Sequence, residues 1–366
     1  DLVSAQTTQM EDEPTLFPIN CFLSPEVLEQ EREKIFKKYP LLIGNACDVQ
    51  NPGEYFTHNE TGIPILIIRD QQNVLHAFVN VCKHRASILV QERNGIAKNS
   101  FKCPYHSWNY GLDGQLLHIP HAYGFHSDQC KNTTLQPLPV VSKYGFIWVN
   151  LDSNAKFDIE HYLGPLAQEL ASYQLEKSVT VEPIVKTINC NWKLWLNTAQ
   201  EDYHFKHLHK NSIEPYFLDN VGLMDVFYPH LRGFIPRKDI LECANKPQVQ
   251  WLDYLHYANA VYIIFPNTMI LTQYGRVTIV SMFPISADKS YYVHSVLLKS
   301  HPKNLKEKIF QEKNTQLFAE ASSEDILAAE SMQAGIKSGY IKHLALGRFE
   351  QGISYFLQNI QKVINR

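Results

Sequence analysis

The sequence lacks the features that mark several large classes of protein. Its 7 cysteines among 366 residues are an odd number and too few for a disulfide-stapled fold. Its 34 basic and 37 acidic residues give a net charge of −3, so no basic field is available to attract a nucleic acid. It contains no run of about 18 apolar residues, which argues against a membrane-spanning helix.

The remaining composition is that of an ordinary globular protein. Hydrophobic residues make up 45% of the chain and aromatic residues 12%, and the length suggests about two domains. The first residues do not form a basic stretch followed by an apolar one, as a secretory signal does. We therefore expect a cytoplasmic protein, with an organellar protein that has lost its presequence as the alternative.

The pattern along the chain predicts an α+β fold. A helix is expected over 24–38, because Ser24 is a good N-cap and Pro25 suits the first helical position. From 40 to 150, short β runs separated by Gly, Asn and Pro turns predict a small antiparallel β domain. Further strands are expected in one antiparallel sheet at 260–265, 269–274, 277–283 and 291–298. Helices are expected at 159–173, 303–319, 322–337 and 347–365, the last with one apolar face.

These elements predict three parts of the chain. Residues 1–39 form an N-terminal helical segment, residues 40–155 the small antiparallel β domain, and residues 156–366 a larger domain. The larger domain has an antiparallel sheet flanked by helices. We expect the β domain to be inserted between the N-terminal segment and the larger domain, on which that segment packs.

Two cysteines differ from the others because each has a histidine at a short spacing. Cys82 is followed by His84, and Cys103 is followed by His106. Two thiolates and two imidazoles can hold a tetrahedral zinc ion, or a [2Fe–2S] cluster with two ligands of each kind. Spacing alone favours zinc, whereas Arg85 and the aromatic residues that flank the second pair favour the cluster. The other five cysteines are interpreted as small buried hydrophobic residues: Cys21, Cys47, Cys130, Cys190 and Cys243.

A second group of ligand-type residues lies between 197 and 209, where three histidines and two acids occur in thirteen residues. Two histidines and one carboxylate are the ligands that O₂-activating non-haem Fe(II) takes. His204 and His209 are five residues apart, about 500° of ideal helix, so they share a face only if the helix ends or distorts between them. His207 is an alternative partner for His204. Asp202 is interpreted as a solvated acid or one that supports the ligands.

The chain resembles the α subunits of the Rieske non-haem iron oxygenases over about 40–360, and within them the carnitine-oxygenase branch. The resemblance rests on four stretches: Cys82-Lys-His-Arg, Cys103-Pro-Tyr-His-Ser-Trp, Asn191-Trp-Lys and Gly347-Arg-Phe-Glu-Gln-Gly. Ser107 stands where the family usually has Gly. The resemblance implies that Cys82, His84, Cys103 and His106 bind a Rieske [2Fe–2S] cluster.

The same resemblance implies the ligands of a mononuclear iron. The family motif of an acid, two residues, His, four residues and His matches Glu201, His204 and His209. The third ligand corresponds to Asp325, although an acid three residues after Ser322 is also a normal helix-dipole partner in a first turn. Glu201 corresponds to the acid that bridges the iron site to the cluster of a neighbouring subunit in a homotrimer, and a glutamate here is typical of the carnitine branch.

The resemblance also implies the partners and the chemistry. A separate NAD(P)H-dependent reductase supplies electrons, O₂ is the co-substrate, and a small organic substrate is hydroxylated. No nucleic acid or membrane is expected as a partner. The leading hypothesis is a monooxygenase that cleaves a C–N bond of a quaternary ammonium compound. The alternatives are an aromatic-ring dioxygenase and, in a different class, a non-catalytic Rieske or zinc protein. Five aromatic residues are candidates for the substrate pocket: Tyr203, Phe205, Tyr262, Phe265 and Tyr274.

Overall fold

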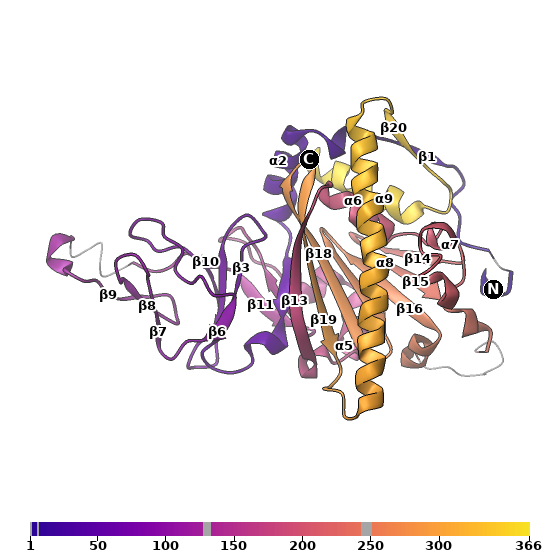
Figure 1. The fold of residues 1–366 in the computed structure, drawn as a ribbon. Coiled ribbons are helices and arrows are strands. Elements are labelled where there is room, and N and C mark those ends of the chain that lie inside the picture. The colour runs from indigo at the N-terminus through magenta and orange to yellow at the C-terminus, as the bar shows by residue number, and fades with distance from the viewer. Residues whose placement is uncertain (1, 6, 127–132, 243–250) are drawn as a thin grey trace. The chain divides into compact units, whose positions relative to one another are not determined.

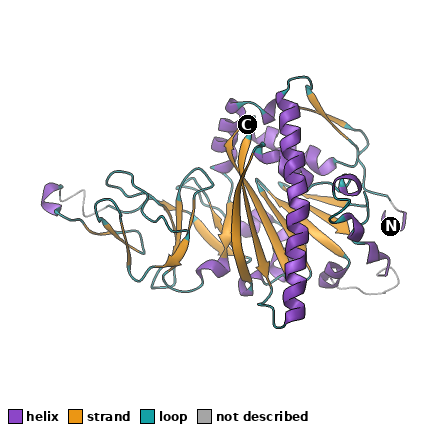
Figure 2. Ribbon diagram, in the orientation of Figure 1, coloured by secondary structure: helices purple, strands orange, loops and turns teal. Residues whose placement is uncertain are grey.

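The structure is a computed structural model of the chain, and it describes residues 2–5, 7–126, 133–242 and 251–366. The chain divides into two compact units. One unit joins Asp1–Ile35 to Val179–Arg366, and the other is Phe36–Ser178. Figure 2 shows that both units combine strands with helices, which confirms the predicted α+β class. Cys130 and Cys243 lie outside the described residues.

The unit of residues 36–178 contains three antiparallel sheets. Their strand orders are β10-β5-β4-β3-β6, β11-β12-β2 and β7-β8-β9. The strands are β2 (Leu41–Asn45), β3 (Glu54–His58), β4 (Ile65–Arg69), β5 (Leu75–Val79), β6 (Asn94–Ile96), β7 (Ser100–Lys102), β8 (Asn109–Gly111), β9 (Leu116–His118), β10 (Pro137–Leu138), β11 (Val140–Lys143) and β12 (Phe146–Val149). The small antiparallel β domain of the prediction is therefore present.

Two short helices extend this unit beyond the predicted boundary at residue 155. The single helix expected over 159–173 is divided into α4 (Ile159–Leu163) and α5 (Leu166–Ser172), because Gly164 has φ +54° and Pro165 follows it. Helix α4 contacts other residues of this unit. Glu160 pairs with Lys143 at 2.6 Å, and the rings of Tyr162 and Tyr39 lie 6.2 Å apart. Residues 156–178 therefore belong to this unit and not to the larger one.

A seven-stranded antiparallel sheet forms the centre of the other unit, in the order β13-β19-β18-β17-β16-β15-β14 (Figure 1). Its strands are β13 (Val179–Ile188), β14 (Leu223–Phe227), β15 (His230–Pro236), β16 (Ala258–Ile264), β17 (Thr268–Gln273), β18 (Arg276–Ser286) and β19 (Lys289–Leu298). The four predicted strands are β16 to β19. The prediction missed β13, an edge strand that Pro183 interrupts where its register shifts, and it missed the hairpin of β14 and β15.

One long helix, α8 (Leu305–Lys337), crosses a face of this sheet (Figure 1). The expectation of two helices over 303–319 and 322–337 is wrong. Ser322 is the expected start of the second helix, but neither it nor Ser323 caps a helix. The Ser322 hydroxyl is 2.7 Å from the hydroxyl of Tyr292, and the Ser323 hydroxyl donates to the Ala319 carbonyl one turn earlier. The helix therefore continues through both serines.

The remaining helices of this unit are shorter. They are α1 (Leu2–Ala5), α2 (Pro25–Glu31), α6 (Trp192–Thr198), α7 (Phe205–Leu208) and α9 (Gln351–Ile364). The apolar face predicted for the last helix is buried in α9, at Ile353, Phe356, Leu357, Ile360, Val363 and Ile364. A two-stranded ribbon pairs β1 (Thr15–Pro18) with β20 (His343–Leu346). No helix among the described residues has both the length and the apolar composition needed to span a bilayer.

The N-terminal residues are fixed to this unit by a buried ion pair. Ser24 caps α2 as expected, but the helix changes to a π turn over Arg32–Phe36 and does not run regularly to 38. Glu31 at the end of α2 binds Lys193 at 2.6 Å and accepts a hydrogen bond from the Trp192 indole at 2.8 Å. Glu31 and Lys193 are both fully buried. Because breaking a buried pair is costly, this contact fixes the N-terminal segment beside α6.

Candidate functional site

His204 and His209 are brought together by a helix of a single turn. α7 spans only Phe205–Leu208, so His204 directly precedes it and His209 directly follows it. His209 has φ −95° and ψ 22°, outside regular helix geometry. Because the helix ends at Leu208, the two histidines can face each other although an ideal helix would place them about 500° apart. His207 is exposed on the same turn, so it is not part of the group.

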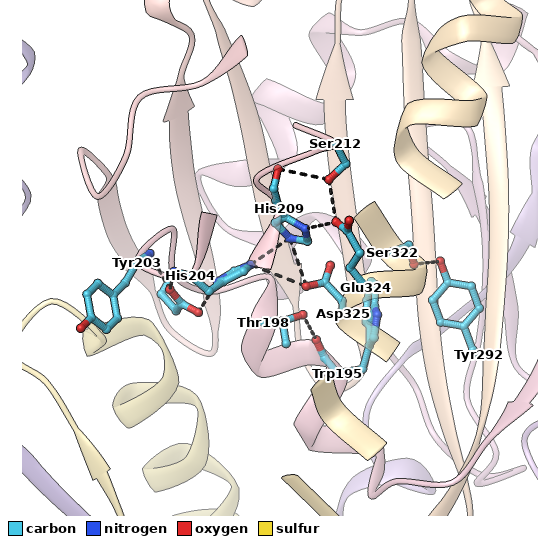
Figure 3. A network of polar contacts seen from close by, with 11 residues as sticks. Trp195, Thr198, Tyr203, His204, His209, Ser212, Tyr292, Ser322, Glu324 and Asp325 are labelled. Carbon is cyan, nitrogen blue, oxygen red and sulfur yellow. Dashed lines mark hydrogen bonds and ion pairs between the residues drawn. The ribbon is translucent and has the colours of Figure 1, made fainter. Parts of the chain in front are cut away.

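Asp325 completes a cluster of three potential metal ligands (Figure 3). The two Nε2 atoms of His204 and His209 are 3.1 Å apart. Asp325 Oδ1 lies 3.6 Å from Nε2 of His204 and 3.2 Å from Nε2 of His209. Asp325 is in the middle of α8, away from the first turn, so its carboxylate is not a partner of the helix dipole.

The outward ring nitrogen of each histidine contacts a second carboxylate. Nδ1 of His204 is 2.5 Å from Glu201, and Nδ1 of His209 is 2.7 Å from Glu324. A carboxylate accepts the Nδ1 proton, so both Nε2 atoms carry a lone pair that points toward the other histidine and Asp325. Lone pairs facing one another without a donor between them fit a bound cation. Asp325 Oδ1 agrees with this, because it is buried and has no hydrogen-bond partner among the described residues.

Glu324 is a functional residue that the sequence interpretation did not single out. It accepts hydrogen bonds from His209 and from the hydroxyl of Ser212, which is 2.6 Å away (Figure 3). Its position directly before Asp325 was the feature of the sequence that could have indicated it. Burial lowers the pKa of His209, but the neighbouring carboxylates of Asp325 and Glu324 outweigh burial and raise the pKa above its ordinary value. The site thus favours positive charge.

Asp202 supports the same loop from a buried position. Its carboxylate accepts a hydrogen bond from the Val221 amide at 3.1 Å, and it is 6% exposed, so it is not a solvated acid. Burial and the nearby charge of Glu201 raise the pKa of Asp202 to about 6. Asp202 therefore joins the ligand loop to the backbone at Val221 and is not one of the three clustered donors.

A cavity of about 530 Å³ opens beside the three ligand atoms. His204, His209 and Asp325 lie in its wall, together with six aromatic residues: Trp195, Phe205, Tyr216, Phe217, Phe310 and Phe318. Of the five aromatic residues proposed from the sequence for a substrate pocket, only Phe205 lines the cavity. Tyr262 and Phe265 are buried in the core, and Tyr203 and Tyr274 are more than half exposed. The pocket prediction was therefore wrong for four residues.

The two Cys–His loops of the smaller unit share one backbone design. In the first, the Ala86 amide donates to the Cys82 carbonyl; in the second, the Ser107 amide donates to the Cys103 carbonyl. Ala86 has φ +58° and Ser107 has φ +60°. Both are therefore in the left-handed region, where a glycine carries no steric penalty. This explains why a glycine would suit the position of Ser107.

The side chains of these loops form two pairs. Cys82 and Cys103 are both 2% exposed, and the rings of His84 and His106 lie 4.6 Å apart. The Tyr110 hydroxyl lies 3.3 Å from the sulfur of Cys82. His84 stacks on Trp108 at 4.9 Å, and its buried Nδ1 has no partner among the described residues. Two buried thiols beside two paired imidazoles, one with an unpaired nitrogen, are a donor set that fits a [2Fe–2S] cluster with mixed ligands.

Comparison with known proteins places both units in families. Residues 168–366 match the family described as ring hydroxylating alpha subunit (catalytic domain), and residues 40–134 match the Rieske [2Fe-2S] domain. The chain is 28% identical over 357 residues to the carnitine monooxygenase oxygenase subunit of Acinetobacter baumannii, covering 93% of this chain and 92% of the relative. It is 27% identical over 362 residues to the chloroplastic choline monooxygenase of Amaranthus tricolor, covering 95% and 77%.

A solved structure is similar over nearly the whole chain. It is the quaternary ammonium Rieske monooxygenase CntA in complex with its substrate L-carnitine, with a TM-score of 0.80 and 25% identity. The match covers 95% of this chain and 94% of that one. The family models and these relatives confirm the predicted cofactors, the fold and the enzyme class. The chain belongs to the ring-hydroxylating α-subunit family: it is the oxygenase component of a Rieske non-haem iron enzyme, which uses O₂, a small organic substrate and electrons from a separate reductase.

Proposed function

We propose that this oxygenase component acts as a monooxygenase on a quaternary ammonium compound and breaks one of its C–N bonds. The observation that carries the proposal is the convergence of His204, His209 and Asp325 in the wall of a cavity rich in aromatic side chains. Aromatic faces hold quaternary ammonium groups with about 0.5–2 kcal/mol per contact. The relatives named for carnitine and choline oxidation support the same substrate class.

The donor geometry supports the ligand assignment. His204, His209 and Asp325 hold the mononuclear iron, and Cys82, Cys103, His84 and His106 hold the cluster. Two imidazoles and a carboxylate are the donor set that O₂-activating iron takes, and iron held by them would lie beside the cavity. Bound there, iron supplies the activation of O₂ for oxygen insertion.

The residues around the iron ligands prepare them for this role. Glu201 and Glu324 keep a proton on Nδ1 of each histidine, which leaves Nε2 free to bind metal. The cavity binds the substrate with its ammonium group against aromatic rings. Hydroxylation of a carbon next to the nitrogen consumes O₂, two electrons and two protons and releases water. The hydroxylated product then separates into an amine and a carbonyl compound, with loss of a proton.

We infer that Glu201 also serves electron transfer in a homotrimer. Its Oε1 contacts Nδ1 of His204, and its Oε2 accepts the amides of Tyr203 and His204. The carboxylate is thereby fixed in the position that, in the family, joins the iron site to a cluster histidine of a neighbouring subunit. The trimer, the bridge and a cytoplasmic location are parts of this proposal. Cys21 and Cys190 are buried and form no disulfide with another described residue, which suits a reducing compartment.

Metal analysis and a substrate screen test the proposal together. Purified protein should contain two irons with labile sulfide and one further iron per chain. With a matched reductase and NADH, oxidation should be coupled to O₂ uptake for carnitine, choline or glycine betaine and give an amine product. An arene such as naphthalene is the comparison substrate. Coupled oxidation of the arene alone would assign the chain to aromatic-ring dihydroxylation, and zinc without sulfide would refute the cofactor assignment.

A further inference from the structure

Residues 7–11 form an N-terminal strap that crosses the start of β14. The Thr8 hydroxyl donates to the Gly222 carbonyl at 3.0 Å and accepts the Gly222 amide at 3.2 Å. The Gln9 amide donates to the same carbonyl, and the Gln9 side-chain oxygen accepts the Met224 amide at 3.1 Å. Thr8 is 8% exposed, so water competes little for these bonds. The strap thereby fixes Gly222, which lies 214 positions after Thr8 in the sequence.

The strap also binds the segment that precedes α9. The Glu11 amide donates to the Arg348 carbonyl at 2.8 Å, and the Arg348 guanidinium donates to the Glu11 carbonyl at 2.5 Å. Phe349, the next residue, packs its ring against that of Tyr203, with the ring centroids 4.6 Å apart. Tyr203 belongs to the loop that carries Glu201, so this segment supports that loop from one side.

The backbone that the strap fixes at Gly222 supports the same loop through Asp202. The Val221 amide donates to the Asp202 carboxylate at 3.1 Å. Gly222 lies so close to this group that a Cβ atom added to it would be 3.1 to 3.3 Å from the three atoms of the carboxylate. In such tight packing, a displacement of Gly222 displaces Asp202 as well.

Glu201 directly precedes the two loop residues that the strap supports. Its carboxylate folds back on the loop, where Oε2 accepts the amides of Tyr203 and His204 and Oε1 contacts Nδ1 of His204. The position of the carboxylate is therefore set by the backbone of the loop. A cavity of about 30 Å³, room for about one water molecule, has Glu201, Thr8 and Gln9 in its wall. The strap and Glu201 thus border the same small space.

We propose that Thr8 is a positioning residue for electron transfer: it holds Gly222 and Asp202, and through them the loop that carries Glu201. Thr8 does not line the substrate cavity, so it acts on the reaction only through this loop. Glu201 contacts an iron ligand, and a displacement of about 1 Å of such a group can lower a rate about 100-fold. The inference rests on the proposed function, because it requires that Glu201 carries electrons to the iron site.

Two substitutions of Thr8 test the proposal in the holoenzyme. Thr8→Val removes both hydrogen bonds of the hydroxyl with little change of shape, whereas Thr8→Ser keeps the hydroxyl. In a single turnover of chemically reduced enzyme with substrate and O₂, the visible absorbance of the cluster reports its re-oxidation. Thr8→Val should slow this step about 3- to 10-fold, with the iron content and the Kd of carnitine unchanged. Thr8→Ser should stay within about twofold of the wild type.

Hydrogen exchange provides a readout that needs no turnover. In Thr8→Val, the backbone amides of residues 202–206 and 221–224 should exchange about 3- to 10-fold faster than in the wild type, because the strap no longer holds them. Thr57→Val is the matched control. The Thr57 hydroxyl is also buried and donates to the Glu92 carbonyl at 3.0 Å, but it belongs to the other unit. Its loss should leave both sets of amides unchanged.

The outcomes separate the strap from the bridge. Unchanged exchange of the loop in Thr8→Val, or faster exchange with cluster re-oxidation within about twofold of the wild type, would overturn the positioning role. Equal slowing by Thr8→Ser would contradict it too. If Thr8→Val does not fold, Gln9→Leu, which removes the Met224 hydrogen bond, takes its place with the same expected direction. If Glu201→Gln re-oxidises its cluster as fast as the wild type, the bridge fails and this inference fails with it.

Discussion

Removal of the Glu324 carboxylate should weaken iron binding without touching an iron ligand. Glu324 accepts the Nδ1 proton of His209 at 2.7 Å and is itself held by Ser212 at 2.6 Å. A hydrogen bond to a charged group contributes about 1.5–3 kcal/mol, and loss of such an outer carboxylate typically costs 10- to 100-fold in metal affinity. Glu324→Gln keeps an acceptor and loses the charge, so we expect about 10-fold weaker iron binding; Glu324→Ala should approach about 100-fold.

Competition with an Fe(II) chelator under anaerobic conditions measures this effect directly. Iron bound per chain would be followed by mass spectrometry, and the visible absorbance of the cluster would report that the other unit is intact. Glu312→Gln is the control, because Glu312 is an exposed glutamate of the same helix whose partner is Lys308. An iron affinity of Glu324→Ala within about threefold of the control would refute the view that the outer carboxylates hold the proton on Nδ1 and so leave Nε2 free to bind iron.

Three further predictions concern other residues. Glu201→Gln should keep both metals and the reduced cluster spectrum yet lose more than about 90% of product formation, and wild-type turnover would contradict the bridge. Ser107→Gly should raise the free energy of unfolding by up to about 1 kcal/mol, because it removes a side chain at φ +60°; Ser87→Gly in the first loop, with no positive φ, should lower it. Burial, with help from Arg276, lowers the pKa of His294 to about 4. A histidine whose pKa falls on folding destabilises the protein as the pH drops below about 6.5, so the change in unfolding free energy between pH 7 and 5, measured with urea, should differ by about 2 kcal/mol between the wild type and His294→Gln.

Local spacing predicted the iron site only in part, because it left His207 open as a partner of His204 and the family motif favoured His209. Two histidines five residues apart required a break in the helix, and the structure has α7 end at Leu208, directly before His209. Asp325 was harder to predict, because Ser322 lies three residues before it and made it look like a normal acid in the first turn of a helix. Only tertiary contacts exclude that interpretation: Ser322 contacts Tyr292 of β19, so the helix has no start there.

The substrate pocket could not be predicted from aromatic residues near the motif. Tyr262 follows Val261 on β16, and neighbouring residues of a strand point to opposite faces. Val261 lines the cavity, so Tyr262 is buried on the other side of the sheet. The aromatic residues that do line it come from distant parts of the chain, such as Phe217 and Phe318, and no local pattern relates these positions.

The continuity of α8 fixes the position of Asp325 in the wall of the cavity. The helix carries Asp325 and, about 10 residues earlier, the Thr315 hydroxyl that accepts from Arg276. Two separate helices, as the sequence suggested, would leave the distance between these two residues adjustable. A single helix fixes this distance at about 1.5 Å per residue, and the contacts of Ser322 and Ser323 maintain the helix where it was expected to break. The spacing between Asp325 and the cavity-lining residues of the earlier turns, such as Lys313, is therefore set by the helix itself.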